Sequence, residues 1–394
     1  MRKAEIVIIG GGVVGASVAY HLAERGVSDV LILECESKQG LGSTGKATGG
    51  IRAQFETDIN IQLSLYSRSF FESCDFECGY EPAGYLFFAT CDRQFECLSR
   101  NVANQLRLGV SDVSVIDRAE VCKLVPGIQS ADIVGGTFGS RDGFIDPIAV
   151  MNGFTSRAAA RGVRIEFDSP VISICENAGR VTSVTTPDES IECDAAVICS
   201  GPRASDVAGT IGIDLPVRPV KRQIVWAETI DDLPNGLPMV IDAGTGFHFR
   251  PARNFSSDAA LRPVRRGRQV LLACPGLEEV SSLNTVCGDE FIRSTCERAY
   301  TRASFLRDLA VVEERCRAGF YENTPDHHAI IGGCEVEGLF LANGFSGHGV
   351  MHSPATGRAL AEIIVDGGSR FLDVSCLHID RFARGELLQE TTLI

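Results

Sequence analysis

The stretch IVIIGGGVVG, residues 6–15, decides the fold of this chain. Its four leading apolar residues indicate a buried parallel strand, and they run directly into a G-x-G-x-x-G pattern. A segment with helical periodicity, 16–25, and a second apolar run, 30–33, follow. Together these segments predict a βαβ unit in which the N–H groups at a helix N-terminus face the pyrophosphate of a dinucleotide.

Three glycines and one acid carry the expected dinucleotide contacts. Gly10 permits the tight turn, Gly12 lets the backbone approach the pyrophosphate, and Gly15 lets helix and strand pack closely. Glu34, 19 residues after Gly15, can accept hydrogen bonds from ribose hydroxyls. No second such pattern follows a strand in the sequence, so one site must serve either a nicotinamide dehydrogenase or a flavoenzyme that takes electrons directly from its substrate.

Length and composition narrow the class of protein. The 394 residues exceed the usual size of one hydrophobic core and predict two domains. The net charge of −14 argues against a nucleic-acid partner or an anionic membrane surface. Glycines interrupt the apolar run 6–20, which argues against a signal peptide, and no apolar stretch is long enough to predict an integral membrane segment.

The fifteen cysteines contain no C-x-x-C pair and no cluster of four. This spacing is unlike a zinc site, an iron–sulfur site or a disulfide framework. We therefore expect no metal, and we interpret the cysteines as reduced structural thiols of a cytoplasmic protein.

The order of elements predicts a fold of the α/β plus α+β class. We expect a Rossmann-type nucleotide-binding domain built from 1–85, 145–215 and 322–394. A second, mainly antiparallel-sheet substrate domain is expected from 86–144 and 216–321. Helices are predicted over 58–73, 93–108 and 147–161, with a further helix near 286–309, and strands over 162–167, 171–175, 181–186, 191–200, 220–227, 247–250, 270–273 and 338–343.

One insertion departs from the acidic pattern. Residues 252–269 carry five arginines against one acid. They indicate either a solvated mobile insertion or a lid or docking patch for an acidic partner.

Two glycine-rich segments suit contact with a planar cofactor. Residues 40–52 are mostly small and are expected to form neither helix nor strand, so few side chains would obstruct a ring. Residues 343–355 combine glycines with two histidines, and we expect Ser353 to cap a helix that has Pro354 at its first position. The positive end of that helix can stabilise negative charge that develops on a reduced isoalloxazine ring.

These segments resemble the glycine/sarcosine oxidase-like, or D-amino-acid oxidase-like, FAD-dependent amine oxidoreductases. The likeness covers nearly the whole chain and is greatest to the branch of sarcosine oxidase β-subunit, proline dehydrogenase β-subunit and dimethylglycine dehydrogenase. It rests on residues 6–34, 42–52, 146–147, 196–202, 321–328 and 344–349.

The resemblance implies a Rossmann-type FAD-binding domain. It also implies oxidation of the C–N bond of a small secondary or N-methylated amino acid of the sarcosine, dimethylglycine or proline type, by hydride transfer to flavin N5. Three alternatives stay open: a D-amino-acid, glycine or opine oxidase or dehydrogenase, a nicotinamide-dependent dehydrogenase, and a non-catalytic FAD-binding subunit or assembly factor.

The resemblance also implies site residues. Arg52 matches an arginine near the flavin and the substrate carboxylate, for which its planar fork is suited, and Arg250 is a second candidate for that contact. His248 falls where some members place a tyrosine over the substrate, and a strand-packing role for it stays open. The candidate catalytic residues are Arg52, His248, Arg250, Tyr321, His348 and Met351.

The candidate cofactor-binding residues come from every segment that carries the likeness. They are Gly10, Gly12, Val14, Gly15, Glu34, Cys35, Ser43, Thr44, Lys46, Thr48, Gly49, Gly50, Ile51, Val171, Ser200, Gly201, Gly344, Phe345, Gly347, His348, Gly349, Val350 and Met351.

Departures from the family patterns bear on the cofactor linkage. Gly319 stands where monomeric sarcosine oxidases carry a flavin-linked cysteine, and Cys316 is out of register with that position. Lys46 stands where dimethylglycine dehydrogenases carry a flavin-linked histidine, and residues 141–152 lack the histidine that links FMN in heterotetrameric sarcosine oxidase. We therefore predict non-covalent FAD and no FMN.

Two lysines of relatives are also missing. Met351 replaces a lysine that holds the substrate carboxylate in some oxidases, and residues 269–277 lack a lysine associated with oxygen activation. Their absence favours a dehydrogenase or a slow oxidase. The expected partners are a small amino-acid substrate and an electron acceptor, either O2 or a redox partner, and the chain can be part of a hetero- or homo-oligomer.

Overall fold

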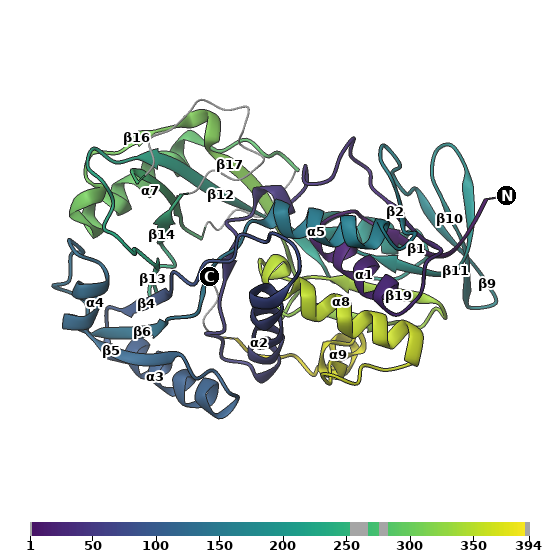
Figure 1. Cartoon of the computed structure of the whole chain (residues 1–394), viewed down its shortest axis with the longest axis horizontal. Coiled ribbons are helices and arrows are strands. Elements are labelled where there is room, and N and C mark those ends of the chain that lie inside the picture. Colours follow the sequence, from purple (N-terminus) through teal and green to yellow (C-terminus); the bar gives the residue numbers. More distant parts are fainter. Residues whose placement is uncertain (1, 253–266, 276–282, 391–394) are drawn as a thin grey trace.

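The computed structural model describes residues 2–252, 267–275 and 283–390. Most of the arginine-rich insertion 252–269 lies outside the described residues, so its predicted role stays a prediction. Two large sheets organise the chain, and Figure 1 shows them at opposite ends of an elongated molecule.

The first sheet contains the predicted βαβ unit. Its central strands run in the order β18-β19-β11-β1-β2-β8, and β10 and β9 extend it from β11. The pairs β1·β2, β1·β11, β2·β8 and β11·β19 are parallel, as expected for strands buried on both faces. Its strands are β1 Arg2–Ile9, β2 Val30–Leu33, β8 Arg164–Glu166, β9 Ser173–Asn177, β10 Arg180–Thr185, β11 Ser190–Ile198, β18 Ile330–Gly333 and β19 Leu339–Asn343.

Helices cover this sheet and complete its core. Helix α1 (Val13–Glu24) packs between α5 (Pro147–Ala159) and α8 (Gly349–Asp366), as Figure 1 shows. Nearly every residue of α1 is buried, because these helices and the sheet surround it. Helix α2 (Asp58–Ser73) packs on α8, while the short helices α6 (Ala204–Gly209) and α9 (Asp380–Arg384) contribute to a second apolar cluster.

The second sheet is mainly antiparallel. Its order is β16-β12-β15-β14-β13-β4-β6-β5, with β17 also paired to β12, and only β13 and β4 run parallel in the described pairs. Helices α3 (Asp92–Arg107), α4 (Arg118–Leu124) and α7 (Asp289–Arg302) pack against it. Its strands are β4 Tyr85–Ala89, β5 Val113–Asp117, β6 Gly135–Gly139, β12 Arg218–Glu228, β13 Met239–Asp242, β14 His248–Pro251, β15 Gln269–Ala273, β16 Ala310–Val311 and β17 Arg317–Asn323.

Most predicted elements are present with ends that differ by a few residues. The Asp146 carboxylate accepts hydrogen bonds from the N–H groups of Ile148 and Ala149, and Pro147 opens α5, as the sequence predicts. The glycine-rich segment 40–52 is more ordered than predicted. It contains a short 3-10 helix, Thr44–Lys46, and strand β3 (Gly50–Ile51), which pairs with β7 (Gly143–Phe144).

The predicted start of the last long helix is wrong. Helix α8 begins at Gly349, and Pro354 lies inside it rather than at its first position. Pro354 has no N–H to give to the carbonyl of Val350, and the Ser353 hydroxyl donates to that carbonyl instead, at 2.9 Å. The Ser353 hydroxyl therefore replaces the backbone hydrogen bond that Pro354 cannot form. The N-terminus of the helix, with its positive dipole end, lies one turn earlier, at Gly349.

Candidate active site

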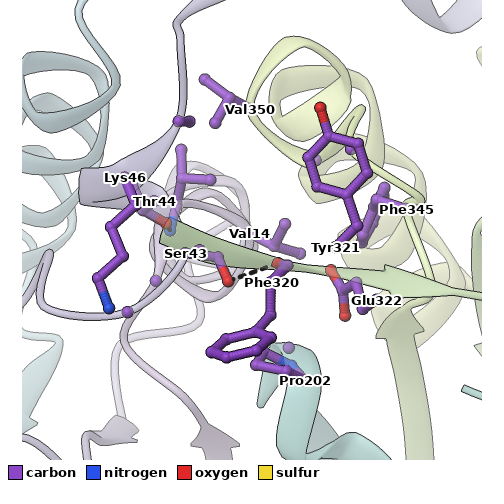
Figure 2. A pocket seen from close by; sticks show the side chains of 18 of the residues that line it. Val14, Ser43, Thr44, Lys46, Pro202, Phe320, Tyr321, Glu322, Phe345 and Val350 are labelled. Carbon is purple, nitrogen blue, oxygen red and sulfur yellow. Dashed lines mark hydrogen bonds between the residues drawn. The ribbon is translucent and has the colours of Figure 1, made fainter. Parts of the chain in front are cut away.

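A cavity of about 480 Å³ lies between the two sheets. Its lining joins the glycine turn after β1, the segment 40–52, the ends of β11 and β17, and the start of α8. Figure 2 shows residues from these elements converging on it. The volume is in the range of pockets that hold small molecules and cofactors.

One end of the cavity is the N-terminus of α1. Gly10 and Gly12 line it, and Glu34 lies beside them. The Val13 N–H donates to the Thr44 hydroxyl at 3.1 Å, so the segment 40–52 packs directly on the helix start. The Glu34 carboxylate accepts from the Gly11 N–H at 2.9 Å. This arrangement offers backbone donors and a positive dipole end to a pyrophosphate.

The position of Gly15 in α1 leaves no room for a side chain. A Cβ atom at Gly15 would lie 2.0 Å from the Gly10 carbonyl oxygen. Gly15 itself does not line the cavity, and its predicted role in close packing therefore accounts for it without a cofactor contact.

Arg52 lies at the other end of the cavity and is 5% exposed. Strand β3 pairs with β7 just before it, and the Ala53 N–H donates to the Asp142 carboxylate at 2.9 Å, which fixes the backbone. The guanidinium lies over the ring of Phe55, 4.5 Å from its centroid. Within the described residues Arg52 forms no ion pair, and its buried Nε has no hydrogen-bond partner.

Two histidines flank Arg52 in neutral form. Arg52 Nη2 donates to His348 Nε2 at 3.4 Å, which requires that nitrogen to be unprotonated. Burial, with Arg52 as the next cause, holds the pKa of His348 well below its usual value. Burial also lowers the pKa of His248 to about 4, with further lowering by Arg52 and Arg222. The positive charge at this end therefore comes from arginine and not from histidine.

Tyr321 lies against the glycine-rich loop that precedes α8. A Cβ atom at Gly347 would lie 2.4 Å from the Tyr321 ring, and Gly347 has a φ of +97°, so glycine is required there for two reasons. The Arg222 guanidinium covers the tyrosine ring at 5.3 Å. The Ser43 hydroxyl donates to the Phe320 carbonyl at 2.8 Å and ties β17 to the segment 40–52 (Figure 2).

The cavity brings together most residues predicted for the site. Among the candidate catalytic residues, Arg52, His248, Tyr321, His348 and Met351 line it. The candidate cofactor residues that line it are Gly10, Gly12, Val14, Glu34, Cys35, Ser43, Thr44, Lys46, Thr48, Gly49, Gly50, Val171, Ser200, Gly201, Phe345, Gly347, His348, Gly349, Val350 and Met351.

Four predicted residues do not line the cavity: Gly15, Ile51, Gly344 and Arg250. Ile51 is fully buried in the core. Arg250 donates to the Thr48 carbonyl and lies over the Phe144 ring at 4.5 Å. The Arg250 guanidinium is thus hydrogen-bonded to a loop residue, and Arg250 itself does not line the cavity. We do not assign Arg250 to the substrate carboxylate.

The sequence interpretation missed several lining residues. Tyr85, Arg222, Gln223 and Glu322 line the cavity without having been predicted. Arg222 and Gln223 lie on β12, and their register opposite β17 could not be derived from the sequence. The only sequence signal for Glu322 was its place next to Tyr321 in the segment 321–328.

The residues at the glycine-turn end and in the middle of the cavity fit FAD. The α1 N-terminus suits a pyrophosphate, and the buried Ser200 Oγ and Glu322 Oε2 atoms, which have no hydrogen-bond partner, belong to residues that line the same cavity. The starting amides of α8 lie farther along, where a positive dipole end would face the ring.

Comparison with known proteins agrees with this geometry. The sequence model of the DAO family, described as FAD dependent oxidoreductase, matches residues 5–363. The chain belongs to the DAO family of FAD-dependent oxidoreductases. The nicotinamide-dehydrogenase alternative is therefore dropped.

Relatives within the DAO family cover the whole length of the chain. FAD-dependent oxidoreductase domain-containing protein 1 of Xenopus laevis is 30% identical, over 100% of this chain and 85% of that protein. Mitochondrial dimethylglycine dehydrogenase of Rattus norvegicus is 26% identical, over 99% of this chain but 46% of that protein. The crystal structure of L-proline dehydrogenase from P. horikoshii has a TM-score of 0.87 at 27% identity and covers 98% of this chain and 100% of that chain.

The remaining expectations concern metal, membrane and location. In the part of the chain that the structure describes, no three His, Cys, Asp or Glu side chains gather as metal ligands. No helix there has the length and apolarity to span a bilayer. The fifteen cysteines all lie among the described residues, and no disulfide joins them. Because several relatives are mitochondrial by name, a cytoplasmic location stays a prediction.

Proposed function

We propose that this FAD-dependent oxidoreductase oxidises the C–N bond of a small secondary or N-methylated amino acid, of the sarcosine, dimethylglycine or proline type. One observation carries the proposal: the buried Arg52 guanidinium lines the cofactor cavity without an acidic partner in the described chain. A buried cation is costly unless an anion pairs with it. A substrate carboxylate would supply that anion, and two of its oxygens match the fork of a guanidinium.

The walls near Arg52 favour a small apolar body on the same substrate. Met239 and Ile241 of β13 and Ala273 of β15 line the cavity and are at most 7% exposed. Apolar side chains at these positions suit an N-methyl group or a pyrrolidine ring. The names of the relatives, dimethylglycine, sarcosine and L-proline dehydrogenase, describe substrates of this class.

The side chains around the substrate bind and orient it more than they move protons. Arg52 would hold the carboxylate, and Tyr321 would bound the reacting end of the cavity. His248 and His348 remain neutral at physiological pH, and the Nδ1 of His248 lies 2.9 Å from the Gly246 carbonyl oxygen, to which it donates. The substrate amine would react as the free base, because its nitrogen lone pair must form the new double bond.

The reaction balances with water as the second reactant. FAD, when bound, accepts a hydride, which is one proton and two electrons, from the carbon next to the amine nitrogen. That carbon–nitrogen bond becomes a C=N bond. Water then adds to the carbon and the C–N bond breaks, which yields a carbonyl group and an amine. O2 or a redox partner would remove the two electrons.

Substitution of Arg52 tests the proposal. Arg52→Gln should raise KM for the amino-acid substrate about 30-fold or more, because a charge-assisted bidentate contact is lost, with a smaller effect on kcat. The matched control is Arg302→Gln. Arg302 of α7 lies over the Phe88 ring at 4.9 Å, as Arg52 lies over Phe87 at 5.4 Å, but it does not line the cavity.

Steady-state kinetics of the two variants give a clear distinction. Arg302→Gln should keep KM within about twofold of the unchanged enzyme, since the carboxylate site is intact. A KM in Arg52→Gln as low as in Arg302→Gln would remove Arg52 from the carboxylate role.

A further inference from the structure

Glu322 is a half-buried acid that the proposed chemistry does not use. It lies near the end of β17 and lines the cavity. Its Oε2 atom is buried and has no hydrogen-bond partner among the described residues. The Ser200 Oγ, two residues past the end of β11, is also buried without a hydrogen-bond partner, and Ser200 lines the same cavity. Two such polar atoms in residues that line one cavity indicate a polar ligand in it.

The surroundings of Glu322 do not neutralise its charge. The backbone N–H groups of Gly344 and Phe345 donate to its carboxyl group. No lysine or arginine forms an ion pair with it in the described chain, and its partner on the neighbouring strand β12 is Pro219. Cys199, whose thiol pKa is raised by burial and by Glu322, faces it from the end of β11. Burial raises the pKa of Glu322 to about 7.

The neighbours of Glu322 connect it both to the glycine turn and to the loop before α8. Figure 2 shows the Glu322 and Tyr321 side chains extending to opposite sides of β17. The backbone N–H of Phe345 donates to the Glu322 carboxyl group. Cys199, beside Glu322, also approaches the glycine turn, because a Cβ atom at Gly10 would lie 2.5 Å from its carbonyl oxygen. Phe345 in turn leads to Gly347 and α8 at the reacting end.

We propose that the Glu322 carboxyl group hydrogen-bonds a hydroxyl of the sugar-alcohol linker of FAD, in the cavity that Ser200 also lines. The linker joins the pyrophosphate to the ring and is the part of FAD that offers uncharged hydroxyl donors. A carboxylate would repel the pyrophosphate and gains nothing from the faces of the ring, whereas a hydroxyl satisfies its free oxygen in either protonation state. The inference rests on FAD binding and not on the identity of the amine substrate.

Ligand binding to the apoprotein tests this assignment. We would measure dissociation constants for FAD, by quenching of flavin fluorescence, and for ADP, by competition with FAD. Glu322→Leu removes the hydrogen-bonding group at similar volume and should weaken FAD binding about tenfold or more. ADP carries the pyrophosphate but neither linker nor ring, so its dissociation constant should stay within about twofold.

Two further variants separate a lost contact from damage to the fold. Glu322→Gln keeps an acceptor oxygen and should weaken FAD binding less than about fivefold. The control variant is Glu362→Gln. Glu362 is a buried carboxylate that accepts from the N–H groups of Arg370 and Phe371 and does not line the cavity. This variant should leave FAD binding unchanged.

Three results would overturn the proposal. The first is unchanged FAD affinity in Glu322→Leu, and the second is an equal loss of ADP affinity in that variant. The third is a loss in Glu322→Gln or Glu362→Gln as large as in Glu322→Leu. Each would show that the linker does not depend on the Glu322 carboxyl group.

Discussion

At the residue scale, Lys46 and Gly319 define one edge of the cavity. Both line it, and a Cβ atom at Gly319 would lie 3.1 Å from the Lys46 Cβ. By resemblance, these are the positions at which two groups of relatives attach their flavin through different residues. The two positions therefore lie next to each other in the cavity lining. Cys316 lies apart, with its sulfur 3.4 Å from the Trp226 nitrogen.

The same residues predict a non-covalent cofactor. Neither an amine at residue 46 nor a glycine at residue 319 offers the thiolate or imidazole of the covalent relatives. Acid denaturation of the purified protein should therefore release all flavin into the supernatant, measured by its absorbance. A yellow pellet, or a fluorescent protein band on a denaturing gel, would contradict this expectation.

Single residues show what sequence patterns do and do not predict. Motif positions such as Arg52 and His348 were predicted because their neighbours in sequence are also their neighbours in the site. Arg250, predicted for the site, does not line the cavity. Arg250 lies on the same strand face as His248, but its guanidinium donates to the carbonyl of Thr48, which belongs to a distant segment. Periodicity gives the face of a strand and not the loop that lies over it.

At the element scale, the start of α8 depends on two adjacent residues. Serine and proline together are typical of a helix start, yet here they lie inside the helix. The loop before α8 is glycine-rich, so no side chain in it indicates where the helix begins. The cofactor-facing helix end was therefore predicted correctly in kind and one turn late in position.

A double-mutant cycle tests this account of α8. Ser353→Ala should lower the free energy of unfolding by about 1 kcal/mol, because the half-buried carbonyl of Val350 loses its donor. Pro354→Ala restores a backbone N–H, so the same serine substitution in that background should cost less than about 0.5 kcal/mol. Urea unfolding of the four proteins gives the coupling. Equal costs in both backgrounds would contradict the account.

At the scale of the whole molecule, separate segments form each part. Strands of the first sheet come from residues 2–33, 164–198 and 330–343. The strands between these segments form the second sheet, except β3 and β7, which pair with each other. The nucleotide-binding unit was predictable because it lies within 30 residues of sequence. The pairing of β12 with β17 was not, since strands about 100 residues apart leave no local signal. The domain boundaries proposed from the sequence stay a prediction.

Buried neutral histidines give the molecule a pH-dependent stability. Burial lowers the pKa of His21 and His248 to about 4 and that of His352 to about 3, and it holds the pKa of His348 well below its usual value. These side chains bind protons at higher pH when unfolded than when folded. The contribution of these histidines to stability is therefore complete above about pH 6.5 and is lost as pH falls from there toward 4.

Unfolding measurements across pH check the effect. Each such histidine contributes up to about 1.4 kcal/mol per pH unit below its unfolded pKa, so the melting temperature should fall steeply between pH 6.5 and 5. Unfolding at pH 5.5 should also be accompanied by proton uptake. Equal stability at pH 7 and pH 5 would show that these histidines are not buried in neutral form.

The central claim is that an amino acid with a secondary or tertiary amine delivers its electrons to FAD in this cavity. The most direct measurement mixes the anaerobic holoprotein with sarcosine, dimethylglycine, L-proline, glycine or a D-amino acid and follows flavin absorbance near 450 nm. We expect bleaching by sarcosine, dimethylglycine or L-proline and not by the others. Bleaching by glycine or a D-amino acid alone would contradict the proposed substrate class, and a flavin that none of them reduces would contradict the central claim.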